Sequence, residues 1–256
     1  MGRVIAISNQ KGGVGKTTTS INLSACLAEK GKKVLVIDID PQGNTTSGLG
    51  LDKDSLKATV YDLMINYAPI WDCISPSVVD NVSVIPSDRD LAGAEIELVG
   101  IKEREYILKK GLKKIRESEV YDYILIDAPP TLGGWVMNIL CASDYVILPV
   151  EASPWGLFGL GNMFEFLDSV EEIAPDLKLG GIVITKVDTR KNYFKQTLET
   201  LQELDDVKVF DTYIRVDSGI EWSQDNNAPV IAYKKSSRSA KEYMELTREI
   251  AATLKG

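Results

Sequence analysis

Short apolar runs recur along the chain and alternate with segments that have helical spacing. An uninterrupted apolar run of this kind is typical of a strand that is buried on both faces. We predict strands at residues 4–7, 33–39, 82–86, 121–127, 145–150, 181–185 and 207–213. We predict helices at residues 20–30, 58–67, 88–95, 102–117, 156–173, 190–204 and 241–254. This alternation predicts an α/β protein in which residues 1–256 form a single domain, with a doubly wound, mostly parallel sheet flanked by helices.

The stretch Asn9–Thr19, which reads NQKGGVGKTTT, lies between the first predicted strand and the first predicted helix. Gly12, Gly13 and Gly15 allow positive φ angles and let the backbone approach an anion without a Cβ in the way. The N–H groups of the loop and the positive end of the helix then point at phosphate oxygens. We therefore predict a nucleotide-binding loop made of Lys11, Gly12, Gly13, Val14, Gly15, Lys16, Thr17 and Thr18.

Two side chains of this loop have specific expected contacts. Lys16 should lie against the β- and γ-phosphates as a point charge, and the Thr17 hydroxyl should be a ligand of Mg²⁺. The general phosphate-loop pattern has a glycine where this chain has Gln10, and a second lysine, Lys11, opens the loop instead. The spacing by itself indicates only that Lys11 is an additional cation near the phosphates.

Acidic residues follow two of the predicted strands. Asp38 and Asp40 come at the end of the strand 33–39, and because they are two residues apart we expect both to face one site. Asp127 ends the strand 121–127, the position where phosphate-loop enzymes hold Mg²⁺ through a carboxylate. The carboxyl ends of parallel strands form the ligand-binding edge of such a sheet. The sequence therefore predicts that Mg²⁺ binds beside a triphosphate at this edge.

Two connecting segments carry local signals of their own. Residues 45–55 are rich in glycine, serine and threonine and have no periodicity, which predicts a flexible loop near the γ-phosphate. Ser87 comes directly before the segment 88–95, and a serine hydroxyl readily accepts a hydrogen bond from a free helix N–H group. We therefore expect Ser87 to cap that helix.

Composition narrows the chemistry further. The 256 residues include no histidine, so catalysis must use carboxylates, lysines, backbone groups and a bound metal. A net charge of −8 disfavours a protein that coats nucleic acid with its whole surface, although it permits a local basic patch. No apolar run approaches bilayer length, and we expect no signal peptide. Cys26, Cys73 and Cys141 lack metal-like pairing, which predicts reduced core thiols in a cytoplasmic protein.

Four segments together are similar to one known family. They are KGGVGKTT at 11–18, DIDPQGN at 38–44, IPSDRDLAGAEIEL at 85–98 and YDYILIDAPP at 121–130. On these motifs the chain resembles the ParA/Soj-type partition ATPases, which have a deviant Walker A loop and belong to the ParA/MinD superfamily. The resemblance implies ATP and Mg²⁺ as cofactors, and slow ATP hydrolysis that a partner protein stimulates.

The same resemblance implies roles for individual residues. Lys11 would contact the nucleotide of the partner subunit in an ATP-bound dimer. Asp40 would position or activate the attacking water, and Asp38 would support the metal shell. The implied catalytic residues are therefore Lys11, Lys16 and Asp40, and the implied metal-site residues are Thr17, Asp38 and Asp127.

Partners follow from the resemblance as well. ParA-type proteins dimerise on ATP, bind DNA without sequence preference and are released when a ParB-like partner stimulates hydrolysis. The expected function is plasmid or chromosome partitioning by a cytoplasmic, nucleoid-associated homodimer. Arg190 and Arg215 match arginines of the family's DNA-binding surface, although relatives often have a proline where this chain has Ile214. Lys234 and Lys235 would extend this patch, and each charge taken singly is equally well explained as a solvated surface residue.

Other interpretations of the same loop stay open at this point. A MinD-like regulator would act on a protein partner without DNA, but MinD-type proteins end in a basic, bulky amphipathic segment that binds membrane. The last predicted helix here mixes charges evenly, so we expect no membrane binding. The residues TKVD at 185–188 match the guanine-reading motif of several GTPases, although the other motifs favour ATP. A redox protein like the nitrogenase iron protein needs paired cysteines, and Cys141 stands alone in its region.

Overall fold

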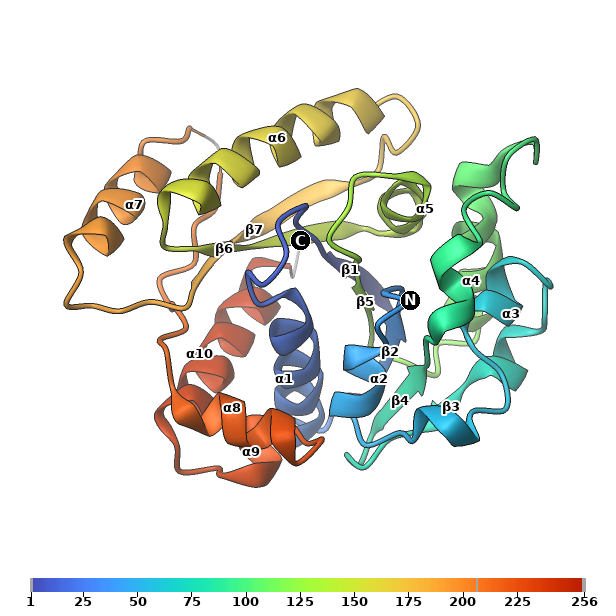
Figure 1. Cartoon of the computed structure of the whole chain (residues 1–256), viewed down its shortest axis with the longest axis horizontal. Helices are drawn as coiled ribbons and strands as arrows, with labels where there is room; N and C mark the ends of the chain where they lie inside the picture. The colour runs from blue at the N-terminus through green and yellow to red at the C-terminus, as the bar shows by residue number, and fades with distance from the viewer. Residues whose placement is uncertain (1, 206, 255–256) are drawn as a thin grey trace.

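The computed structural model describes residues 2–205 and 207–254, which contain a seven-stranded sheet (Figure 1). The strand order is β3-β4-β2-β5-β1-β6-β7, and every neighbouring pair is parallel except β3 with β4. The strands are β1 Arg3–Ile7, β2 Val34–Asp38, β3 Ser75–Pro76, β4 Val82–Ile85, β5 Tyr123–Asp127, β6 Tyr145–Glu151 and β7 Lys178–Thr185. The doubly wound, mostly parallel sheet predicted from the apolar runs is confirmed.

Helices cover both faces of this sheet (Figure 1). One face packs against α4 Ile107–Glu117, α5 Gly134–Ala142 and α6 Pro154–Val170. The opposite face packs against α1 Lys16–Glu29 and α10 Arg238–Thr253. The remaining helices are α2 Asn44–Gly48, α3 Val60–Met64, α7 Asn192–Gln202, α8 Ser218–Asp225 and α9 Val230–Tyr233.

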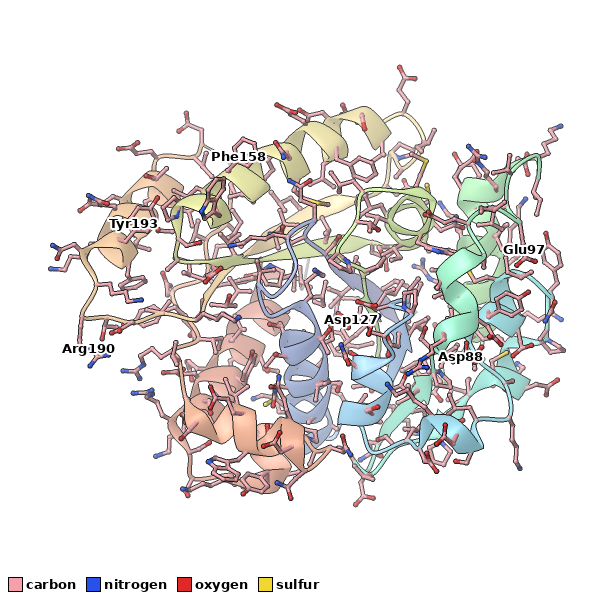
Figure 2. The ribbon with its side chains drawn as sticks, viewed as in Figure 1. Asp88, Glu97, Asp127, Phe158, Arg190 and Tyr193 are labelled. Carbon is pink, nitrogen blue, oxygen red and sulfur yellow. The ribbon has the colours of Figure 1, made fainter. Side chains whose placement is uncertain are left out.

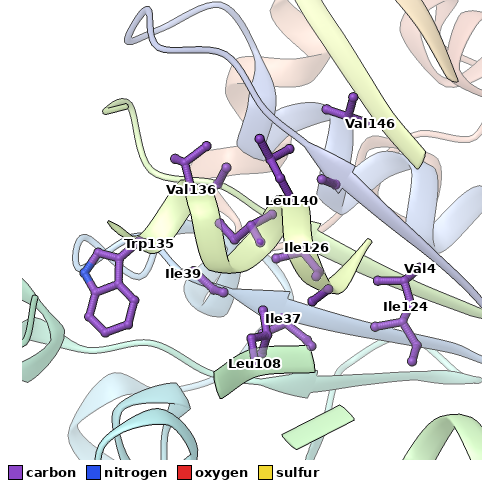
Figure 3. Close-up of a cluster of buried hydrophobic side chains, with 14 of the residues drawn as sticks. Val4, Ile37, Ile39, Leu108, Ile124, Ile126, Trp135, Val136, Leu140 and Val146 are labelled. Atoms are coloured by element: carbon purple, nitrogen blue, oxygen red, sulfur yellow. The ribbon is translucent and has the colours of Figure 1, made fainter. Parts of the chain in front are cut away.

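Alternate residues of the central strand β1 enter two separate cores. Val4 and Ala6 pack into the core beneath α4, α5 and α6, part of which Figure 3 shows. Ile5 and Ile7 pack into the other core, against α1 and α10. Because successive side chains of a strand point to opposite faces, a strand covered on both faces must be apolar at every position. This is why the apolar runs predicted the sheet so well.

The register of the central strands places their carboxyl ends at one level. Ile7 of β1 and Asp38 of β2 both pair with Asp127 of β5. The glycine-rich loop leaves β1 at this level and leads into α1. Two carboxylates and a helix N-terminus therefore meet at one edge of the sheet, as predicted from the positions of the acidic residues.

The segment 45–55 is not the flexible loop that its composition predicted. Asn44–Gly48 form α2, and Thr45 and Thr46 are buried. The helix lies so close to α1 that a Cβ on Gly48 would come within 2.4 Å of the Ile21 side chain. Close packing on α1 and hydrogen bonds to sheet carboxylates, described below, therefore outweigh the local preference for turns.

The predicted cap of the segment 88–95 is also wrong. A 3₁₀ turn at Arg89–Gly93 is capped by Asp88, whose carboxylate accepts a hydrogen bond from the backbone N–H of Asp90 at 3.1 Å. Ser87 is buried, and its own N–H donates to the Thr46 hydroxyl at 2.9 Å. Ser87 therefore connects the end of β4 to α2 through this hydrogen bond.

Residues 207–213 follow the edge of β7 without forming the continuous strand that we predicted. An isolated parallel bridge joins this segment to Ile182. The N–H groups of Asp211 and Thr212 instead donate to the carboxylate of Glu249 on α10, at 2.8 and 2.9 Å. Because a helix side chain takes these donors, the ladder with β7 stays incomplete.

Besides α2, three helices have no counterpart in the sequence prediction: α5, α8 and α9. α5 is almost wholly buried, so it has no polar face and no amphipathic signal. α8 and α9 are short and lie in a region rich in polar residues. The last helix begins at Arg238, three residues before the predicted start, because the Ser237 side chain accepts a hydrogen bond from the N–H of Ala240. The cysteines are buried and form no disulfide, as predicted.

Candidate nucleotide-binding site

The glycine-rich loop has the conformation that its composition predicts. Gly13 and Gly15 have φ angles of 73° and 89°, in the left-handed region that favours glycine. Gly15 is the N-cap of α1 and offers no side-chain acceptor. The first N–H groups of α1 are therefore available to an anion, with the helix dipole behind them.

Lys16 is folded back into this loop. Its side chain is buried, and Nζ donates to the carbonyl of Lys11 at 3.1 Å. Burial lowers the pKa of Lys16, while the charges of Asp127 and Asp40 act in the opposite direction. The ammonium is thus largely desolvated before any nucleotide arrives, which strengthens its attraction to a phosphate.

Asp127 lies at the end of β5, in the centre of the molecule (Figure 2), and is fully buried. Three hydroxyls donate to its carboxylate: Thr17 at 2.8 Å, Ser20 at 3.0 Å and Thr45 at 2.7 Å. α1 and α2 therefore both attach to this acid. The predicted partners Thr17 and Asp127 are brought together.

Asp38 is the second buried carboxylate. It accepts hydrogen bonds from the N–H and the hydroxyl of Thr46, both at 2.8 Å, and from the N–H of Asp40 at 3.1 Å. Burial, followed by the charge of Asp127, raises the pKa of Asp38 to about 7. Burial raises the pKa of Asp127 as well, although the hydrogen bonds from Thr45, Thr17 and Ser20 act to lower it.

These two acids suit a hard divalent cation. Two like charges held side by side in a buried site repel one another, and a cation would remove that cost. Thr17 adds a hydroxyl oxygen 2.8 Å from Asp127, so the donors are all oxygen, as Mg²⁺ prefers. The residues present therefore fit Mg²⁺, with Thr17, Asp127 and Asp38 as those that would hold it directly or through water.

Three hydroxyl residues of this site escaped the sequence prediction: Ser20, Thr45 and Thr46. Their partners lie 107, 82 and 8 residues away along the chain. The run NTTS directly after DPQG was a possible signal, because hydroxyls that follow a motif at a strand end are placed to contact its acids. The composition of that run alone predicts only a flexible loop near the γ-phosphate.

Asp40 occupies a different environment from Asp38. β2 ends at Asp38, so the alternation of a strand does not extend to Asp40. Asp40 borders the open cavity, and its carboxylate accepts the N–H of Gln42 at 2.9 Å. Asp38 is therefore an internal acid, whereas Asp40 is accessible to a ligand.

A cavity of about 850 Å³ lies over the loop. At one end it is lined by Gly12, Gly13, Gly15, Lys16, Thr17, Thr18 and Asp40. At the other end it is lined by Ile214, Arg215, Val216, Asp217, Ile220 and Gln224. A phosphate-binding end joined to a mixed apolar and polar end has the form of a nucleotide site. Val14 is buried instead, and its carbonyl accepts the Thr185 hydroxyl at 2.7 Å.

Lys11 points away from this cavity toward α6. Its ammonium lies 2.6 Å from a carboxylate oxygen of Glu151 and 3.3 Å from the hydroxyl of Ser153. Ser153 also caps α6, and hydrogen bonding by Lys11 lowers the pKa of Glu151. The Lys11 ammonium is thus held at the surface where α6 begins, while the Lys11 carbonyl accepts a hydrogen bond from Lys16. Sequence reasoning missed Glu151 because its contact with Lys11 spans 140 residues.

The predicted DNA-binding arginines both line one groove of about 540 Å³ beside the cavity. Arg190 is highly exposed (Figure 2) and makes a bidentate ion pair with Asp188, at 2.8 and 2.9 Å. Arg215 pairs with the carboxylate of Glu242 on α10. Each arginine therefore already has an acidic partner, which sequence reasoning did not predict.

The two predicted lysines differ from each other. Lys234 is exposed and has no ion-pair partner within 4.0 Å among residues 2–205 and 207–254. Lys235 pairs with Glu29 at the end of α1. Lys234 lines a neighbouring hollow together with Arg238, which also borders the groove of the arginines. Lys234 therefore lies on a surface that adjoins the groove of Arg190 and Arg215.

Known proteins are similar to this chain over most of its length. Residues 2–179 match the AAA domain family. The sporulation initiation inhibitor protein Soj of Bacillus subtilis is 44% identical over 253 residues, which cover 98% of this chain and 99% of that protein. The chromosome partitioning protein ParA of Myxococcus xanthus is 39% identical, over 98% of this chain and 88% of that protein. The chain belongs to the ParA/Soj family of partition ATPases.

The fold of this ParA/Soj family member is shared by solved structures. A cobyrinic acid a,c-diamide synthase from Mycobacterium smegmatis, with bound ATP analogue and magnesium, superposes with a TM-score of 0.88. It is 32% identical, and the match covers 100% of this chain and 96% of that one. Within the part of the chain that the structure describes, no helix has both the length and the apolar character needed to cross a membrane.

Proposed function

We propose that this chain is an Mg²⁺-dependent ATPase that dimerises on ATP, binds DNA without sequence preference and acts with a ParB-like partner in plasmid or chromosome partitioning. The observation that carries the proposal is the buried pair Asp38 and Asp127, aligned in register beside the loop lysine Lys16. The ParA and Soj relatives support the partitioning role. We further propose that residues 1–256 act as one ATPase domain, in the cytoplasm at the nucleoid.

The phosphate end of the cavity would bind the triphosphate through backbone and lysine. Free N–H groups at the start of α1 would receive the phosphate oxygens, and Lys16 would lie against the β- and γ-phosphates. Mg²⁺, held by Thr17, Asp127 and Asp38, would neutralise charge that develops on the phosphates. Asp40 is the accessible acid at this end and is suited to orient the attacking water.

Completion of the site would require a second subunit. Lys11 is paired with Glu151 at the end of β6, and in the following helix α6 Trp155 and Phe158 are 72% and 66% exposed. Exposed aromatic residues beside a lysine that must reach another nucleotide support a dimer at this surface. Hydrolysis should therefore be slow in dilute protein and rise with concentration and with the partner.

Binding of DNA should depend on ATP and on the groove arginines. We expect double substitution of Arg190 and Arg215 with alanine to weaken DNA binding about tenfold at moderate salt, since two phosphate contacts are lost. ATP-dependent dimerisation should remain. The measurement is fluorescence anisotropy of a labelled duplex with ATP, with ADP and without nucleotide, at two salt concentrations, and light scattering for the dimer.

The control for this experiment is a double substitution of Lys113 and Lys114, two exposed lysines of α4, with alanine. α4 packs on the sheet face opposite to α1 and α10, so its lysines lie away from the groove. This control removes the same net charge and should bind DNA normally. Normal binding by the arginine variant would overturn the groove assignment, and equal binding without nucleotide would count against a ParA-type cycle.

The metal-free protein should lose stability as the pH rises. The pKa of Asp38 is raised to about 7 in the folded state, so the native state binds more protons than the unfolded state between pH 4 and pH 7. The free energy of unfolding should therefore fall by about 2 kcal/mol from pH 5 to pH 7.5. Urea unfolding in EDTA at several pH values measures this change.

A matched pair of variants isolates the acid that is responsible. Asp38→Asn removes the buried charge and should remove most of the pH dependence. Asp80→Asn, at an exposed turn, should retain it. Added Mg²⁺ should stabilise the unaltered protein more at pH 7.5 than at pH 5. A stability that is constant between these pH values would contradict the buried acid pair as its cause.

A further inference from the structure

Lys186, directly after β7, has a backbone conformation that residues other than glycine rarely adopt. Its φ angle is 52°, in the left-handed region. For a residue with a long side chain this conformation carries a conformational cost, and it persists only where neighbouring contacts impose it. Such positions concentrate at ligand sites, so the surroundings of Lys186 are informative.

The residues on either side of Lys186 are fixed by hydrogen bonds. Thr185 is buried, and its hydroxyl donates to the carbonyl of Val14 in the phosphate loop at 2.7 Å. The N–H of Val187 donates to the carbonyl of Ile214 at 3.0 Å. One contact ties β7 to the phosphate loop and the other ties it to the nucleoside end of the cavity. Lys186 is the residue between these two attachments, and they impose its conformation.

The side chain of Lys186 is aimed at the loop. It lines the cavity, and a Cβ on Gly13 would lie 3.8 Å from its Nζ atom. The ammonium is exposed and has no ion pair within 4.0 Å among the residues that the structure describes, although Glu151 lies close enough to interact electrostatically. An exposed cation without a close partner, beside the N–H groups of a phosphate loop, is suited to contact an anion there.

The residues of the TKVD motif at 185–188 therefore do not form a guanine-binding site but make other contacts. Its aspartate, Asp188, is held in the bidentate ion pair with Arg190. Its threonine fixes the phosphate loop, and its lysine borders the phosphate end of the cavity. The parts of the motif that face the cavity are thus the threonine and the lysine.

We propose that Lys186 is a further nucleotide-binding residue, which contacts the phosphate chain of the bound nucleoside triphosphate in addition to Lys16. The inference rests on the proposed ATP-binding function and adds a residue that no phosphate-loop motif contains. The strained backbone of Lys186 places its ammonium beside Gly13 of the phosphate loop. DNA phosphates in the adjoining groove are the competing ligand, and the experiment separates the two.

The test compares substitutions that separate charge from backbone strain. Lys186→Met removes the charge and keeps the strain, Lys186→Gly removes both, and Lys186→Arg keeps the charge. Asn81→Gly is the control, since Asn81 has a φ angle of 64° in an exposed turn before β4 and does not line the cavity. Calorimetry measures the Kd for Mg·ATP, thermal unfolding measures Tm, and duplex anisotropy measures DNA binding.

We expect Lys186→Met and Lys186→Gly to weaken Mg·ATP binding about tenfold, as loss of one charge-assisted contact implies. Lys186→Arg should bind almost normally. Both glycine variants should unfold at or above the Tm of the unaltered protein, because they relieve strain, while Asn81→Gly keeps full ATP affinity. This combination of retained stability and weakened binding would not arise from a merely structural lysine.

Three outcomes would overturn the assignment. Unchanged Mg·ATP affinity in Lys186→Met and Lys186→Gly would remove Lys186 from the nucleotide site. Unchanged ATP affinity with weakened DNA binding would assign the lysine to the groove instead. Absence of Mg·ATP binding in the unaltered protein would overturn the proposed ATPase function itself, and this assignment with it.

Discussion

Substitution of Lys16 with alanine is expected to weaken Mg·ATP binding by about 1,000-fold. The reason is that one buried ammonium would make two charge-assisted hydrogen bonds, to the β- and γ-phosphates, each worth about 1.5–3 kcal/mol. Lys16 is largely desolvated, so these bonds replace few contacts with water. Calorimetry with Mg·ATP measures the loss, and turnover should fall with it.

The metal-free fold should survive this substitution. Burial of the ammonium is itself costly, as the lowered pKa of Lys16 shows, so the alanine variant should unfold at no lower a temperature. Lys114→Ala, on the exposed face of α4, is the control and should bind Mg·ATP normally. Undiminished nucleotide binding by a folded Lys16→Ala protein would refute the phosphate site.

Substitution of Asp40 with alanine should separate binding from hydrolysis. Asp40 borders the cavity and is not one of the two buried acids, so Mg·ATP affinity should change less than threefold. Turnover should fall by about 1,000-fold, within the range for removal of a group that orients or activates the reacting water. Single-turnover hydrolysis with ATP in the dimer state measures the chemical step directly.

The matched control for Asp40 is Asp54→Ala, an exposed acid in the connection that follows α2. It should hydrolyse ATP at the normal rate. If Asp40→Ala hydrolysed ATP normally, the water-orienting role would pass to another group. If it failed to bind Mg·ATP, Asp40 would belong to the binding site rather than to the chemical step.

Contacts across the whole molecule explain why several sequence expectations failed. Thr45 reaches Asp127 across 82 residues, and Lys11 reaches Glu151 across 140. The segment 207–213 does not form a continuous strand, because Glu249 on α10 accepts hydrogen bonds from the N–H groups of Asp211 and Thr212. None of these partners can be read from spacing or propensity, since each depends on how distant elements pack.

The amino-acid sequence by itself determined the sheet, its flanking helices and the phosphate loop. Apolar runs specify strands buried on both faces, and three glycines specify a loop with positive φ angles, so both signals are local in the chain. It also located Lys16, Thr17, Asp38 and Asp127 at one edge, because carboxyl ends of parallel strands meet there.

Only the tertiary structure decided how these groups are used. It buried Asp38 and left Asp40 open, converted a turn-like segment into α2, and paired Arg215 with Glu242. It also held Lys186 in a strained conformation over Gly13. The physical reason is that burial, ion pairing and strain belong to neighbourhoods made by the packed chain, whereas periodicity and backbone preference belong to each segment alone.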